Sequence, residues 1–97
     1  MHIQILGKPD CHLCHVAEKI ARSLQAEFGF TLEWVDIQQS TALSDQYAMR
    51  IPVLLIDGME AGAGRLTEGV IRRAIKKARW SGSVSRILSR IRNLMRG

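Results

Sequence analysis

The sequence lacks several features that would assign it to particular classes of protein. It has no apolar run long enough to cross a bilayer, since the longest, Val53 to Ile56, has only the length of a strand. No basic stretch and small-residue cleavage site follow Met1, so we expect no secretory signal. It also lacks internal repeats and low-complexity tracts. Its 97 residues are 46% hydrophobic, which predicts one small folded domain with a core of its own.

Cysteine is scarce, and the two cysteines present are close together. Cys11 and Cys14 are separated by two residues. Without a secretory signal we expect a reducing, cytoplasmic location. There, a close cysteine pair is more often catalytic or metal-binding than a structural staple.

Acidic residues are missing from one end of the chain. Residues 76–97 carry seven Lys/Arg and no Asp/Glu, whereas residues 1–75 carry seven Lys/Arg and nine Asp/Glu, a balance of −2. The net charge of +5 therefore belongs to a basic tail on a slightly acidic body.

Hydrophobic periodicity and turn signals predict the element order β-α-β-α-β-β-α, an α/β fold. Asp10 is expected to cap the first helix, with Leu13 and Val16 in its buried stripe. The βαβ unit implies a parallel strand pair, and Asp57-Gly58 predicts a hairpin that adds an antiparallel edge. The expected strands are 1–6, 32–37, 53–56 and 59–61, and the expected helices are 11–28, 40–49, 67–80 and 84–95.

The cysteine pair stands where the first strand hands over to the first helix. The first turn of a helix has backbone N–H groups without intrahelical partners, and these favour an anion. A cysteine thiolate there is stabilised and reactive near neutral pH. This placement favours redox chemistry.

Three segments give the chain a family resemblance. They are residues 8–14 after the first strand, residues 35–37 in the second, and residues 47–53 before Asp57-Gly58. The chain resembles thioredoxin-fold proteins, and most nearly the small glutaredoxin-like proteins, over residues 1–80. The resemblance implies a thioredoxin-like mixed four-stranded sheet. Residues 81–97 are expected to add a hinge and a basic amphipathic C-terminal helix.

The resemblance also implies roles for particular residues. Cys11 would be the exposed nucleophile and Cys14 the buried resolving thiol, together forming a redox-active disulfide. Ile51-Pro52 would be a cis peptide bond facing the cysteines, where substrate backbone pairs. Lys8 matches a lysine that meets a carboxylate of glutathione.

We therefore expect Lys8, His12, Ile51 and Pro52 to bind substrate. His12, like His15, would stabilise the thiolate if protonated, although both histidines could equally be merely solvent-exposed. Arg50 stands where glutaredoxins usually have Thr, and residues 62–66 lack their usual Gly-Gly and acid. These departures weaken the case for a glutathione site and leave a dithiol mechanism intact.

The resulting prediction is a thiol–disulfide oxidoreductase in cell redox homeostasis, without a resident cofactor or metal. Its expected partners are a disulfide-containing protein or glutathione as co-substrate, with a reductase as electron donor. The basic C-terminal helix is expected to pack on the domain or to meet an acidic partner or membrane surface; no nucleic acid is expected.

Two other classes of function stay open. One is a thioredoxin-fold adaptor whose cysteines do no catalysis. The other is a metal-binding module in which two thiolates and the imidazole of His2, His12 or His15 hold zinc. Cys11-x-x-Cys14-His15 also matches the c-type haem attachment pattern, but the strands and the missing signal argue against a cytochrome.

Overall fold

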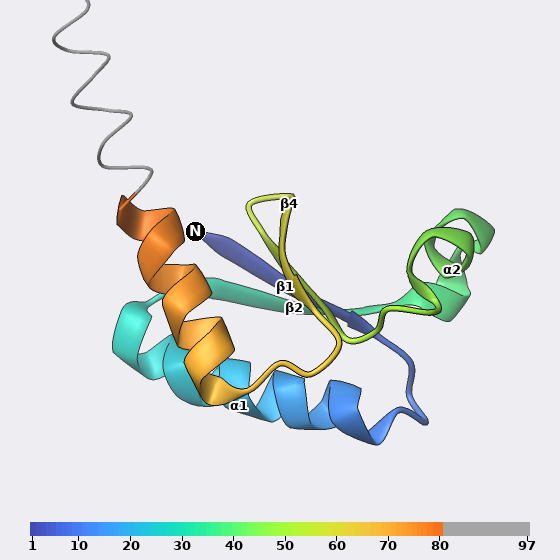
Figure 1. Cartoon of the computed structure of the whole chain (residues 1–97), viewed down its shortest axis with the longest axis horizontal. Coiled ribbons are helices and arrows are strands. Elements are labelled where there is room, and N and C mark those ends of the chain that lie inside the picture. The colour runs from blue at the N-terminus through green and yellow to red at the C-terminus, as the bar shows by residue number, and fades with distance from the viewer. Residues whose placement is uncertain (81–97) are drawn as a thin grey trace, which may run out of the picture.

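The computed structural model describes residues 1–80, so the predicted hinge and basic helix over 81–97 lie outside the described residues. The predicted order of elements is confirmed (Figure 1). A helix over residues 68–80, called helix 68–80 below, is the last described element. The other elements are β1 (His2–Gly7), α1 (His12–Phe28), β2 (Thr31–Asp36), the 3-10 turn η1 (Ile37–Gln39), α2 (Thr41–Tyr47), β3 (Val53–Ile56) and β4 (Met59–Ala63).

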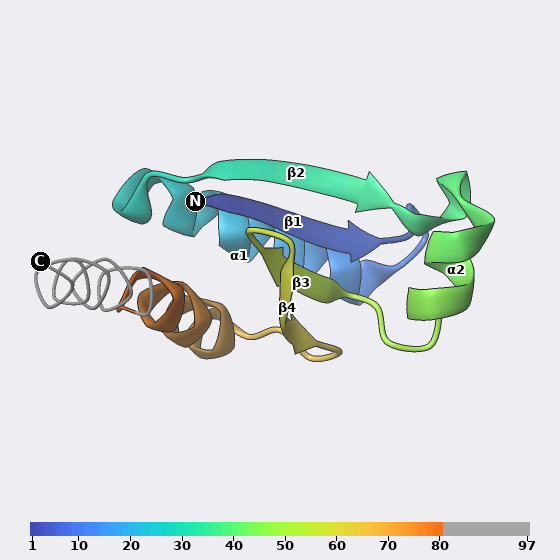
Figure 2. The same ribbon diagram turned by 90° about the horizontal axis from the view of Figure 1, so that it is seen from above.

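The four strands form one mixed sheet in the order β2-β1-β3-β4 (Figure 2). β1 and β2 run parallel, in register from His2–Thr31 to Gly7–Asp36, while β3 is antiparallel to both β1 and β4. The β3–β4 turn has positive φ at Asp57 (50°) and Gly58 (82°). Two positive φ values suit the twist of a two-residue hairpin, and Asp-Gly tolerates them well. The fold class predicted from the sequence is thus confirmed.

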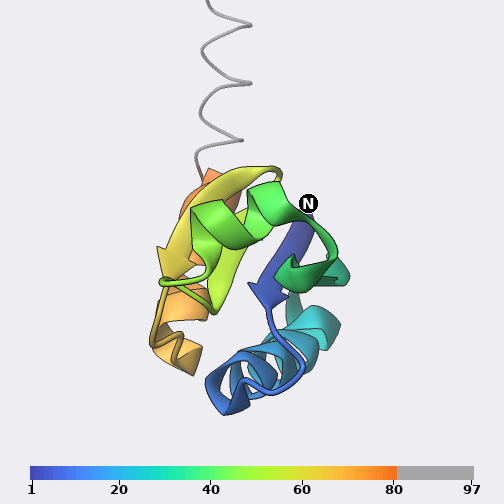
Figure 3. The ribbon, with the colours of Figure 1, turned by 90° about the vertical axis from the view of Figure 1, so that its right-hand side faces the viewer.

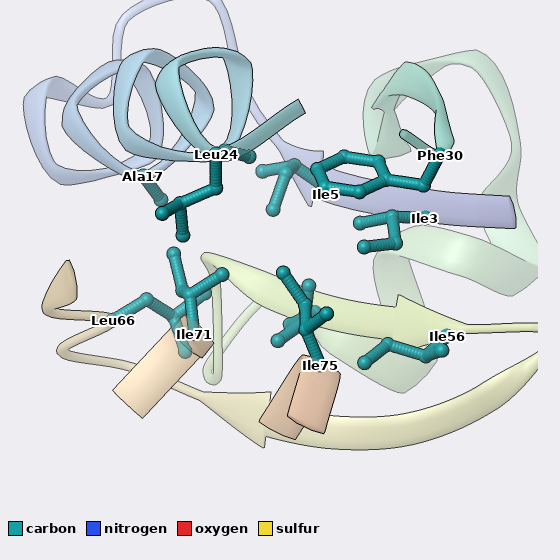
Figure 4. Packing of buried hydrophobic residues seen from close by; sticks show 11 residues of the cluster. Ile3, Ile5, Ala17, Leu24, Phe30, Ile56, Leu66, Ile71 and Ile75 are labelled. Carbon is teal, nitrogen blue, oxygen red and sulfur yellow. The ribbon is translucent and has the colours of Figure 1, made fainter. Parts of the chain in front are cut away.

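One face of the sheet is covered by α1 and helix 68–80. Side chains alternate between the two faces of a strand, so Ile3 and Ile5 of β1 point to this side. Ile71 and Ile75 of helix 68–80 meet them, and all four side chains are fully buried (Figure 4). This cluster is the main core of the described domain.

The other face is divided into a covered half and an open half. Leu6 and Val53 are buried under α2, which lies at the end of the sheet where β1 and β2 finish (Figures 1 and 2). The open half carries polar side chains. Gln4 Nε2 donates to Glu33 Oε1 at 2.8 Å, and His2 Nδ1 lies 2.7 Å from Thr31 Oγ1. α2 therefore covers this face only at the end of the sheet near the cysteines.

Some boundaries differ from the sequence prediction. β4 continues through Gly62 to Ala63, where a loop was expected, because Leu54 and Val53 of β3 pair with Gly62 and Ala63. α2 ends at Tyr47 rather than Met49. Within residues 1–80, no helix has both the length and the apolar character needed to cross a bilayer.

Candidate functional site

The cysteine loop and the Ile51-Pro52 loop meet at one end of the sheet. Leu6 of β1 pairs with Val53 of antiparallel β3, so the chain leaves β1 and enters β3 at the same end of the sheet. Residues 8–11 continue from β1 there, and Ile51-Pro52 leads into β3. Figure 3 looks onto this end, with α2 above and the start of α1 below. The topology thus brings together segments about forty residues apart in the sequence.

Cys11 and Cys14 form a disulfide, with their Cα atoms 5.3 Å apart. Their environments differ: Cys14 is fully buried (0% exposed), whereas Cys11 is partly exposed. A reagent from solvent therefore has access to Cys11 and not to Cys14. This is the asymmetry that a nucleophilic and a resolving cysteine require.

Cys11, and not Asp10, caps α1, so the prediction for Asp10 was wrong. Cys11 has extended backbone angles (φ −93°, ψ 107°), and its sulfur accepts a hydrogen bond from the Cys14 N–H at 3.2 Å. The sulfur takes the place of the side-chain oxygen that Ser, Thr, Asp or Asn usually supplies at an N-cap. The Cys11 sulfur itself thus receives a hydrogen bond from the first turn of the helix, which favours its anionic form in the reduced protein.

Gly7 allows α1 to lie very close to the sheet. A Cβ at Gly7 would stand 2.7 Å from Cys14 Cβ, 2.8 Å from Cys14 Sγ and 2.9 Å from the ring of Trp34. No real Cβ tolerates such contacts. This role of Gly7 depends on side chains from two other elements, so no local sequence signal indicates it.

The peptide bond between Ile51 and Pro52 is cis, as the resemblance implied. Pro52 is buried and Ile51 is partly exposed. The Gly64 N–H donates to the Pro52 carbonyl oxygen at 2.8 Å and also lies 3.1 Å from the Arg50 carbonyl oxygen. The end of β4 therefore holds this loop, a role for Gly64 that no local sequence signal indicates.

Lys8 and His12 flank the cysteine pair. The Lys8 carbonyl oxygen accepts from the Cys11 N–H at 3.1 Å, and its side chain is partly exposed. His12 is the first residue of α1 and is exposed. Within residues 1–80 neither side chain makes a salt bridge, so no ion pair fixes the orientation of either one.

Arg50 is held within the protein. Its guanidinium forms an ion pair with Glu60 of β4 and lies over the Tyr47 ring, 5.5 Å from the ring centroid. It is therefore a paired charge on the surface of the protein.

Two apolar side chains beside the cysteines are exposed, against the sequence prediction. Leu13 is 53% exposed and Val16 is 38% exposed. They line a groove of about 300 Å³ between α1 and the start of helix 68–80, together with Ile20 and Leu66. Helical periodicity counted them in the buried stripe, but the residues buried in this part of α1 are Cys14 and Ala17.

The metal-binding alternative gains no support from the geometry. Across residues 1–80, no three His, Cys, Asp or Glu side chains are grouped so that they could hold a metal ion. His2 lies at the opposite end of β1 from the cysteines, and its ring contacts Thr31 and Glu33.

The sheet order, the flanking helices and the cysteine pair at the start of α1 define a thioredoxin-fold protein. Comparison with solved structures agrees. A point mutant of thioredoxin from Halobacterium salinarum superposes with a TM-score of 0.60 at 21% identity, covering 78% of this chain and 72% of that one. Thioredoxin 1 from Thermosipho africanus gives 0.54 at 15% identity, covering 81% and 99%. A structure described as that of a malarial protein gives 0.57 at 18% identity, covering 78% and 93%.

The family is narrower than the fold. Residues 2–76 match the family described as glutaredoxin-like domain (DUF836), and the chain belongs to that family. No curated protein sequence matches the chain significantly.

Proposed function

We propose that the protein is a thiol–disulfide oxidoreductase that acts through Cys11 and Cys14 in cell redox homeostasis. The observation that carries the proposal is the asymmetric pair at the start of α1. Cys11 is partly exposed and its sulfur accepts a backbone N–H, while Cys14, bonded to it, is fully buried. An adaptor without catalysis has no need of this arrangement.

The reaction proceeds in two exchanges. The Cys11 thiolate attacks one sulfur of a substrate disulfide, so a Cys11–substrate disulfide forms and the other substrate sulfur leaves as a thiolate that takes up a proton. The Cys14 thiolate then attacks the Cys11 sulfur. The Cys11–Cys14 disulfide forms, and the second substrate thiol is released. The substrate gains two electrons and the protein loses two, and a dithiol reductase or glutathione restores the reduced pair.

The remaining predicted residues have supporting roles in this proposal. Ile51-Pro52 lies at the same end of the sheet as the cysteines and offers backbone to the substrate. Lys8 and His12 place positive charge or a hydrogen-bond donor beside the incoming disulfide. No resident cofactor takes part, and a cytoplasmic location follows only as part of the proposal.

Substitution of each cysteine tests the mechanism. We expect Cys11→Ser to lower kcat/KM for disulfide reduction by roughly a thousandfold or more, because the attacking sulfur is gone. Cys14→Ser should form the mixed disulfide and retain it, which mass spectrometry of the intact protein detects. Full activity in Cys11→Ser would overturn the mechanism. Alkylation of Cys11 with a half-reaction pH near the free-thiol value of about 8.5 would instead favour the adaptor.

The exposed Leu13 and Val16 favour a protein disulfide over glutathione as substrate. In this proposal the residues that flank the substrate sulfur contact these apolar side chains, whereas glutathione is small and charged. We expect Leu13→Ser to raise KM for a protein disulfide about fivefold, from the loss of about 1 kcal/mol of apolar burial. KM for hydroxyethyl disulfide should stay constant in the same variant.

Lys19→Ser, at an exposed position of α1, is the matched control. Equal changes in KM for both substrates of Leu13→Ser would remove the apolar side chain from substrate binding.

A further inference from the structure

We propose that His15 is a positioning residue that clamps the loop before Cys11 to α1 and to the sheet. The proposal builds on the thiol–disulfide function above and adds a residue to its site. His15 follows the resolving cysteine directly, and its imidazole reaches back over the loop rather than out to solvent alone.

The imidazole makes two contacts at once. Its Nε2 lies 2.6 Å from the carbonyl oxygen of Pro9, and its ring stacks on Trp34 with centroids 5.2 Å apart and planes 9° from parallel. A carbonyl oxygen only accepts, so Nε2 must carry the proton. The neutral ring is thereby fixed in one tautomer, with Nδ1 bare, and the contact is also available to the charged ring.

The Pro9 carbonyl is the point where this loop can be held. The backbone bonds nearby are short-range: the Cys11 N–H donates to the Lys8 oxygen at 3.1 Å, and the His15 N–H donates to the Cys11 oxygen at 3.2 Å. Within the described part of the chain, His15 provides the one side-chain hydrogen bond to the backbone of residues 8–10. The clamp therefore limits how far this loop, and Cys11 with it, can swing away from α1.

Trp34 gives the clamp a rigid base. It lies in β2, pairs with Ile5 of β1 and packs against the main core. The imidazole thus links the sheet, through Trp34, to the loop that leads to Cys11, through the Pro9 carbonyl oxygen. Through that loop it maintains the hydrogen bond from the Cys14 N–H to the Cys11 sulfur. Loss of the clamp should loosen this hydrogen bond and make the thiolate less stable.

Other charged groups on the segments that meet at this end of the sheet stay constant in the test. Lys8 and Asp10 lie on the loop, and His12 lies on α1. From the loop before Pro52, Arg50 is paired with Glu60. At the end of β2, Asp36 accepts from the Gln38 N–H at 2.9 Å. Variants of His15 alone leave all of these in place.

The experiment separates the hydrogen bond from the charge of His15. In the full chain carrying Cys14→Ser, the rate of Cys11 alkylation by iodoacetamide is measured against pH for His15, His15→Gln and His15→Phe. Gln keeps a donor at the position of Nε2 without the charge, and Phe keeps a ring for Trp34 without the donor. Lys19→Phe is the control for adding an aromatic ring to an exposed position of α1.

We expect His15→Phe to raise the half-reaction pH by about half a unit to one unit above that of His15→Gln. Lys19→Phe should match the parent protein. Equal half-reaction pH values in the Phe and Gln variants would overturn the clamp, and so would a His15→Phe value equal to that of the parent.

A second measurement is independent of the thiol chemistry. Hydrogen exchange of the Cys11 amide should become about fivefold faster in His15→Phe, matching the loss of one ordinary hydrogen bond, and should stay near the parent rate in His15→Gln. Unchanged exchange in His15→Phe would overturn the clamp even if the protein reduced disulfides well. If no disulfide is reduced but the exchange differs as expected, the clamp stands and the proposed function fails.

Discussion

At the scale of single residues, Gly7 determines how closely α1 approaches the sheet. We expect Gly7→Ala to lower the free energy of unfolding by about 1–3 kcal/mol, because the added Cβ would overlap Cys14 and Trp34. Urea unfolding followed by circular dichroism measures the change. Gly69→Ala is the control, since the nearest atoms to its added Cβ are in the Arg73 side chain, 3.7 Å or more away. A Gly7→Ala variant as stable as the control would show that α1 can shift outward without cost.

The sequence predicts the reacting residues better than the residues that support them. Cys11 and Cys14 are recognisable from their spacing and from the strand-to-helix junction, both of which are local. The importance of Gly7 and the stacking of His15 on Trp34 depend on α1 lying against β2, and no local pattern records that distance. The N-cap was missed for a chemical reason, since cysteine rarely caps a helix whereas Asp10 belongs to the preferred residue types.

At the scale of elements, a threonine side chain caps the start of helix 68–80. Thr67 Oγ1 accepts from the Val70 N–H at 3.2 Å. We expect Thr67→Ala to lower the free energy of unfolding by about 1 kcal/mol, because one N–H of the first turn loses its partner. Thr67→Ser keeps the hydroxyl and should stay close to the parent in the same urea titration. Equal losses in both variants would assign the effect to the Thr67 methyl group instead.

Element types could be predicted because each carries its own signal. Gly29, with φ at 66°, ends α1 as its position after the periodic run indicates, and Ser40 caps α2. The burial of α1 could be predicted only in part. The apolar side of α1 is wider than the part that the sheet buries. Periodicity therefore does not show that Leu13 and Val16, at the margin of that side, line a groove.

At the scale of the whole molecule, the order of the strands was beyond local signals. The βαβ unit fixes that β1 and β2 are parallel, but the insertion of β1 between β2 and β3 rests on long-range pairing. That insertion is what places residues 8–11 beside Ile51-Pro52. The family resemblance implied a mixed four-stranded sheet, which the structure confirms, and the strand order is a finding of the structure.

Acid should weaken the whole fold partly through the open face of the sheet. Hydrogen bonds from Gln4 and then His2 lower the pKa of Glu33 below its ordinary value. A carboxyl with a depressed pKa in the folded state stabilises the protein above its unfolded pKa, and this contribution disappears as the pH falls through the folded value. We therefore expect the free energy of unfolding to fall less steeply between about pH 5 and pH 3 in Glu33→Gln.

Urea titrations at a series of pH values test this expectation. Asp45→Asn removes the same charge from an exposed residue of α2 and serves as the control. A Glu33→Gln profile parallel to that of the parent would show that the Gln4 and His2 contacts do not persist in solution.

The closeness of Trp34 to Cys14 also has a spectroscopic consequence. The Cys14 sulfur and the Trp34 ring both lie within 3 Å of the point where a Gly7 Cβ would stand. A disulfide accepts an electron from an excited indole at such short range, so the emission of Trp34 should be quenched in the oxidised protein and recover on reduction. Trp80, which is 71% exposed, would contribute a steady background. Tryptophan fluorescence of the unlabelled protein should therefore report whether the Cys11–Cys14 disulfide is oxidised or reduced.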